Sequence, residues 1–87
     1  MNTSIMQKDT FKTSDSVLAA TLLSLGYVAI DFSSIKGRTF IFFENNPRLQ
    51  SDVSKYWTRK LLVEPTSFQL NYKRIKSVID TQNNDNS

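Results

Sequence analysis

The segment 38–44 constrains the fold of this chain more than any other part of the sequence. Its residues, RTFIFFE, include four consecutive bulky apolar side chains of types that favour strands. Phe40 and Phe42 lie on one face of the expected strand, because side chains alternate along a strand. Ile41 and Phe43 lie on the other face. A strand that is apolar on both faces is covered on both sides or offers one face to a partner.

A second strand is expected over 27–32, where Val28, Ile30 and Phe32 recur at every second position. These three residues share one face of that strand. The residues 33–37 that follow are mostly turn formers and end on a glycine, which adopts positive φ readily. The two strands therefore predict an antiparallel hairpin.

Start and stop signals indicate three helices. The first is expected over 14–25, because Thr13-Ser14-Asp15 is a start signal and Gly26 supplies a left-handed cap. The second begins at Pro47, with Asn46 as its N-cap. The third begins at the next proline, residue 65.

Apolar stripes give the expected core faces of the last two helices. The stripe of the second helix comprises Leu49, Val53, Tyr56 and Trp57. The stripe of the third helix comprises Phe68, Tyr72, Ile75 and Ile79. Leu70 lies opposite this stripe and is expected to be exposed, unless a partner covers it. Residues 61–63 are a candidate third strand.

These elements predict an α+β fold with the order α-β-β-α-α, in which the hairpin packs with three helices. We expect a flexible N-terminus over 1–10, a single domain over 11–79 and a disordered polar tail over 80–87. The sequence contains no cysteine and no long apolar run, so we expect a cytoplasmic protein without a membrane segment.

The expected domain carries a surplus of positive charge. The whole chain has a formal net charge of +3, and residues 11–79 contain ten basic and five acidic residues. This balance is compatible with a polyanionic partner, although net charge also supports solubility alone.

Three groups of basic residues are candidates for nucleic-acid binding. They lie on one face of the second helix, around the exposed arc of the third, and at the tip of the hairpin. The first group can follow a phosphate backbone, or it is a solvated helix face. The groups comprise Arg48, Lys55 and Arg59; Lys73, Arg74 and Lys76; and Lys36 and Arg38.

The aromatic residues are candidates for an interface. If the helices cover one face of the hairpin, either Phe40 and Phe42 or Ile41 and Phe43 stay uncovered. With Tyr27 nearby, an uncovered pair can stack unpaired bases, pack in the core, or form a contact with a partner protein or a second copy. Leu70 is a further candidate contact.

The sequence lacks several of the residue types and motifs that are typical of enzyme active sites. The sequence has no histidine and no cysteine, and it contains no Gly-rich phosphate loop or nucleophile elbow. Asp31 and Glu44 end the two strands and are the sole candidates for a carboxylate metal site, which would need further convergent ligands. We therefore expect no catalytic residues, no metal, no cofactor and no small-molecule substrate.

A set of capping, turn and core residues resembles a family of small bacterial, archaeal and phage domains whose function is unassigned. The matching residues are Phe11-Lys12-Thr13-Ser14-Asp15, Leu18-Ala19-Ala20, Leu22-Leu23, Gly26, Gly37-Arg38, Phe40-Ile41-Phe42-Phe43-Glu44, Pro47, Leu49, Tyr56-Trp57, Leu62-Val63-Glu64-Pro65 and Phe68. Where this family usually has an aspartate before the proline, the chain has Glu64. The resemblance implies a fold and no catalytic residues.

The leading functional prediction is therefore a non-catalytic accessory module that binds nucleic acid, alone or within a nucleoprotein assembly. The alternative is a protein-interaction or homodimerisation module that uses the apolar outer face of the hairpin.

Overall fold

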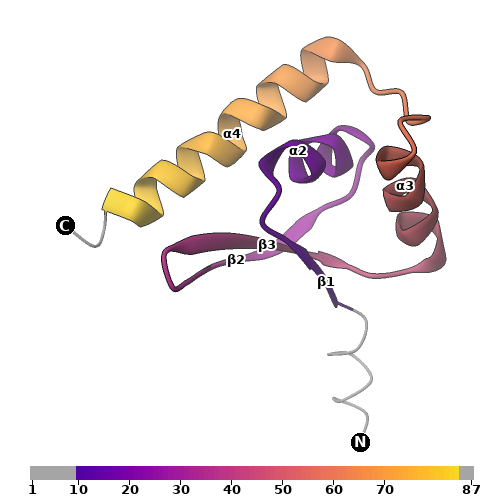
Figure 1. The fold of residues 1–87 in the computed structure, drawn as a ribbon. Helices are drawn as coiled ribbons and strands as arrows, with labels where there is room; N and C mark the ends of the chain where they lie inside the picture. The colour runs from indigo at the N-terminus through magenta and orange to yellow at the C-terminus, as the bar shows by residue number, and fades with distance from the viewer. Residues whose placement is uncertain (1–9, 85–87) are drawn as a thin grey trace, which may run out of the picture.

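Three strands and three helices make up the chain in the computed structural model, which describes residues 10–84 (Figure 1). The predicted α+β class is confirmed. The elements in order are β1 (Thr10–Thr13), α2 (Ser16–Ser24), β2 (Ala29–Ile35), β3 (Arg38–Glu44), α3 (Pro47–Trp57) and α4 (Pro65–Asn84).

The sheet has the order β1-β3-β2, and both outer strands run antiparallel to β3. The strands β1 and β2 are therefore parallel to each other, α2 connects them, and β3 lies between them. This arrangement is the split βαβ unit. Figure 1 shows the helices on one side of the sheet, so β3 is covered by protein on that side.

The strand β1 was not predicted, and its residues were expected to precede a helix. It contains four residues, and Phe11 lies opposite Phe43 in the register. Three of its residues, Thr10, Phe11 and Thr13, are of types that favour strands, but a run of four residues is too short to identify a strand by alternation, and pairing with β3 determines its conformation. The candidate third strand over 61–63 is irregular instead, and Leu62 is 89% exposed.

The strand β2 begins and ends later than predicted, and its alternation is interrupted by an irregularity between Ala29 and Asp31. A β-bulge of this kind changes the direction of the following side chains. As a result Ala29 and Phe32 pack against the core, whereas Ile30 is 57% exposed. The expected shared face of Val28, Ile30 and Phe32 is therefore wrong.

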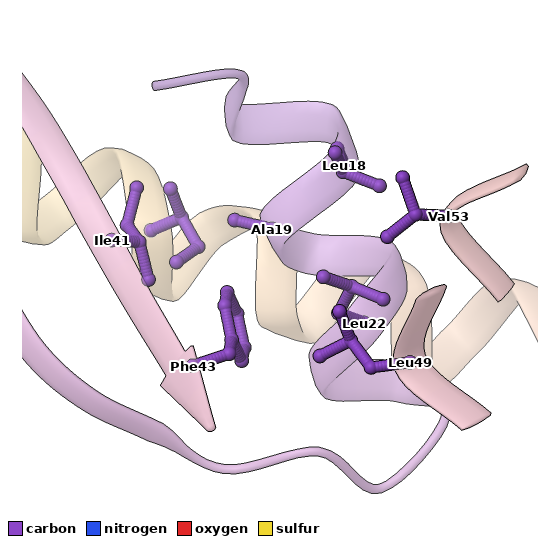
Figure 2. Packing of buried hydrophobic residues seen from close by; sticks show 8 residues of the cluster. Leu18, Ala19, Leu22, Ile41, Phe43, Leu49 and Val53 are labelled. Atoms are coloured by element: carbon purple, nitrogen blue, oxygen red, sulfur yellow. The ribbon is translucent and has the colours of Figure 1, made fainter. Parts of the chain in front are cut away.

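Other elements pack around the helix α2, so its buried side chains are not confined to one face. Its buried residues are Leu18, Ala19, Ala20, Thr21 and Leu22. Figure 2 shows β3 and α3 directing core side chains toward this helix, and α4 packs against it as well. Asp15 caps it, since its Oδ1 accepts the N–H groups of Val17 and Leu18 at 2.9 and 3.1 Å.

The helix α3 starts as predicted, because the Asn46 side chain accepts the N–H of Leu49 at 2.8 Å. Leu49 and Val53 are buried against α2 (Figure 2). Trp57 does not belong to the core stripe, since it is 63% exposed at the last position of the helix. The chain then leaves the helix at Arg59, whose φ is +62°.

The helix α4 begins as predicted after Glu64, whose carboxylate accepts the N–H groups of Thr66 and Ser67 at 3.1 and 2.7 Å. These bonds lower the pKa of Glu64. Ile75 is the fully buried member of the predicted stripe.

The C-terminal end of α4 corrects the predicted tail. The helix continues to Asn84, so residues 80–84 are helical where disorder was expected. Thr39 donates a hydrogen bond to Gln82 at 3.1 Å, which holds this last part of the helix to β3. Thr10, expected in the flexible terminus, belongs to β1. The rest of the predicted flexible N-terminus and residues 85–87 lie outside the described residues.

Candidate functional site: the open face of the sheet

The helices cover one face of β3 and leave the other without a helical layer. Ile41 and Phe43 point into the core and are 0% exposed (Figure 2). They were candidate interface residues, and this prediction is wrong because α2 packs directly on them. Phe40 and Phe42 occupy the opposite face and are half-buried. We call the face that carries Phe40 and Phe42 the open face.

Charged residues lie at both ends of the open face. Lys12 lies opposite Phe42 in the register, and its Nζ is 5.1 Å from the centroid of the Phe40 ring. That distance is within the range of a cation–π contact. Asp31 also lies opposite Phe42, and Glu44 lies one alternation further along β3. The surroundings of Phe40 are therefore basic, and those of Phe42 are mainly acidic.

A shallow hollow opens beside Phe42. Its volume is about 480 Å³, and it is lined by Thr10, Ile30, Asp31 and Phe42. The bulge in β2 places Ile30 there, and Asp31 Oδ1 accepts the N–H of Phe32 at 2.8 Å. The hollow therefore combines an aromatic ring, an aliphatic wall, a hydroxyl group and a carboxylate.

The hairpin tip lies at the basic end of the open face. Lys36 and Gly37 both have positive φ, at +54° and +80°, which indicates a two-residue turn. The positive φ predicted for Gly37 is confirmed. Arg38 follows directly and shares the face of Phe40 by strand alternation. Lys36 and Arg38 are both exposed, as their predicted role requires.

The predicted basic row on α3 is not a single row. Arg48 lies over the Tyr27 ring, with 5.0 Å between the guanidinium carbon and the ring centroid. Lys55 is in the last turn of the helix, whereas Arg59 lies beyond its end in a left-handed conformation. The helical spacing used to group the three residues therefore does not apply to Arg59.

Tyr27 lies away from the open face, which corrects its predicted place beside the aromatic pair. It precedes β2, and its hydroxyl donates a hydrogen bond to Asp52 of α3 at 2.6 Å. Burial and this bond to Asp52 raise the pKa of Tyr27 to about 12. Its role is to join the start of β2 to α3.

The basic residues of α4 lie on the helical side of the molecule. Lys73, Arg74 and Lys76 are exposed, and so is Leu70 at 62%. The structure therefore separates these four residues from Phe40 and Phe42. Arg74 lines a groove of about 600 Å³ between β2 and α4, which no sequence pattern indicated. Val28, predicted to lie within the second strand, instead precedes β2 and is 72% exposed where it lines this groove.

Within residues 10–84, no three acidic, histidine or cysteine side chains lie close enough to hold a metal ion. Asp31 and Glu44 are not directly opposite each other, since Asp31 lies opposite Phe42. None of the described helices is both long enough and apolar enough to cross a membrane.

The fold and this face define a small α+β domain with a split βαβ sheet and two aromatic residues on its open side. The chain belongs to the DUF5659 family, which is described as a domain of unknown function and matches residues 8–81. The predicted resemblance to a small-domain family of unassigned function is thereby confirmed. Comparisons with curated proteins and with solved structures gave no match.

Proposed function

We propose that this domain is a non-catalytic module that binds single-stranded nucleic acid on its open face. The observation that carries the proposal is the pair Phe40 and Phe42, which lie two positions apart on the central strand and have no described helix over them. Aromatic side chains on an open sheet stack unpaired bases in several single-strand binders. The binding is proposed to occur in the cytoplasm, which the lack of cysteine favours.

The charges of the open face support an oriented strand. Lys12 and Arg38 lie near Phe40, and Lys36 extends the positive charge to the hairpin tip. Phosphates that flank a base on Phe40 would lie close to these three residues. Asp31 and Glu44 repel phosphate near Phe42, so we expect Phe40 to contribute more affinity than Phe42.

Fluorescence anisotropy with a labelled single-stranded RNA and its DNA counterpart tests the proposal. Stacking contributes about 1–3 kcal/mol per base, so Phe40→Leu is expected to weaken binding about five- to 150-fold. Leucine keeps apolar cover over the strand and removes the π-face. Leu70→Ala is the matched control, because Leu70 is an exposed apolar residue of α4 and lies away from the open face.

Salt dependence completes the test. Binding is expected to weaken between about 50 and 200 mM salt. Lys12→Gln is expected to reduce by about one the slope of the logarithm of the binding constant against the logarithm of the salt concentration. Absence of binding at low salt would overturn the proposal. Equal affinities of the Phe40→Leu variant and the wild-type protein would overturn the assignment of the open face.

A second candidate function is homodimerisation through the same face. The specific observation that favours it is the arrangement of charge: the Lys12 ammonium group lies over Phe40, on the side of Arg38, whereas Asp31 and Glu44 lie toward Phe42. In a face-to-face dimer whose two-fold axis lies in the interface and runs perpendicular to β3, the basic end of each copy would lie against the acidic end of the other. Sedimentation equilibrium without nucleic acid distinguishes the two candidates. If the open face forms a dimer, the wild type has the mass of a dimer and the Phe42→Ser variant has the mass of a monomer.

A further inference from the structure

We propose that the groove between β2 and α4 is a second binding site, and that its ligand is a small amphipathic anion. Such a ligand has an apolar chain or ring that ends in a carboxylate. The groove has a volume of about 600 Å³, which lies within the range of sites for small ligands. This inference does not depend on nucleic-acid binding, because the groove lies on the helical side of the sheet.

The groove exists because α4 packs mainly on α2. Contacts between α4 and α2 are extensive, whereas α4 meets β3 near its C-terminal end, where Thr39 bonds to Gln82. The covered side of β2 is therefore incompletely filled beside Phe32, which is half-buried. Val28, which precedes β2, also lines the groove and is 72% exposed.

The lining of the groove is mainly apolar. Leu23 of α2, Phe32 of β2, and Ile75 and Val78 of α4 contribute apolar walls from three elements. Transfer of an apolar chain from water into such a groove is favourable, because it removes apolar surface from water. The apolar lining of the groove therefore suits the apolar chain or ring of the proposed ligand.

The polar residues of the groove determine which head group fits. Among the described residues that line it, Arg74 alone carries a charge. Asn71 also lines the groove, and its amide nitrogen donates one hydrogen bond to the Ser24 hydroxyl at 3.1 Å, which leaves its second N–H. A guanidinium group can donate two parallel hydrogen bonds to a carboxylate. Charge complementarity therefore selects an anion with one compact head group.

A titration with octanoate, octanol and octylamine, followed by two-dimensional NMR, tests this proposal. The three probes share one chain and differ in head group. Octanoate is expected to shift the amide signals of Phe32 and Ile75 and to bind about fivefold more tightly than octylamine, as expected for a partly exposed ion pair. An acetylated apolar dipeptide with a free carboxyl end, titrated in parallel, separates a peptide terminus from a free carboxylic acid as the source of the carboxylate.

Two variants and one control make the test specific. Arg74→Gln is expected to abolish the preference for octanoate over octylamine, and Ser77→Phe is expected to block all three probes by filling the groove from an exposed position. Lys76→Gln removes a neighbouring positive charge that does not line the groove and is expected to keep the preference. Equal binding of octanoate and octylamine by the wild type would overturn the proposal. So would equal effects of the Arg74 and Lys76 substitutions, or self-association of the free protein through the groove.

Discussion

Alanine substitutions at two positions of β3, Phe43 and Phe40, test which face of the sheet is covered. Phe43 is 0% exposed and packs under α2, so Phe43→Ala removes buried surface and leaves a closed cavity. Substitutions of this kind cost about 3–5 kcal/mol. Phe40 is half-buried on the open face, and solvent fills the space that its ring leaves. We expect Phe40→Ala to cost about 1–2 kcal/mol, part of the free energy of burying one side chain.

The difference is measurable because a domain of this size has a small free energy of unfolding. At about 0.05–0.15 kcal/mol per residue, the whole chain has about 4–13 kcal/mol. Urea denaturation followed by far-UV circular dichroism measures the loss, with a slope of about 1 kcal/mol per M for a small domain. Trp57 is 63% exposed, so its fluorescence is the less suitable signal.

The expected result is a midpoint at least about 1 M lower for Phe43→Ala than for Phe40→Ala. Equal midpoints for the two variants would refute the assignment of the covered face, and so would a larger loss for Phe40→Ala. The proposed nucleic-acid site would then lose its structural basis, because it requires that Phe40 be accessible.

Three further predictions concern local structure. Tyr27→Phe is expected to destabilise the domain by about 1 kcal/mol, because the bond to Asp52 is lost. The pKa of Tyr27 is raised to about 12 in the folded state, so the stabilisation by the protonated hydroxyl is complete below about pH 10 and is lost as the pH rises toward about 12. The free energy of unfolding of the Tyr27→Phe variant, measured by denaturation, should lack this fall between about pH 10 and 12. Lys36→Asn is expected to raise the thermal midpoint, because asparagine tolerates the φ of +54° better than lysine does; an unchanged or lower midpoint contradicts the turn geometry. Asp15→Ala is expected to cost about 1 kcal/mol in calorimetry, because α2 loses its N-cap, and Asp15→Asn should retain most of that stability.

Local signals in the sequence were sufficient for the parts of the fold that depend on local chemistry. Asn46-Pro47 predicted the start of α3, and Gly37 predicted a positive φ, because capping and turn geometry involve residues close in sequence. The strand β1 could not be predicted in this way. Its pairing partner is β3, about thirty residues away, and a segment of four residues is too short to show an alternating pattern, although most of its residues favour strands.

The candidate site was predicted in part. Alternation along β3 identified two pairs, but the open pair depends on the side to which α2 packs, which is a property of the tertiary structure. The grouping of Arg48 with Arg59 failed because α3 ends at Trp57, a boundary that lacks a glycine or proline signal. The groove beside Arg74 depends on the packing of α4 on α2, which has no local signal.

The enclosure of α2 has a consequence for hydrogen exchange. The sheet, α3 and α4 contact this helix from different sides, so its amide hydrogens reach solvent only when the packing of the whole domain opens. In deuterated buffer, the amides of Leu18 to Leu22 are therefore expected to exchange last. Their exchange free energy would then equal the global free energy of unfolding. The irregular segment 60–64 is expected to exchange early, which gives one experiment an internal scale of stability along the chain.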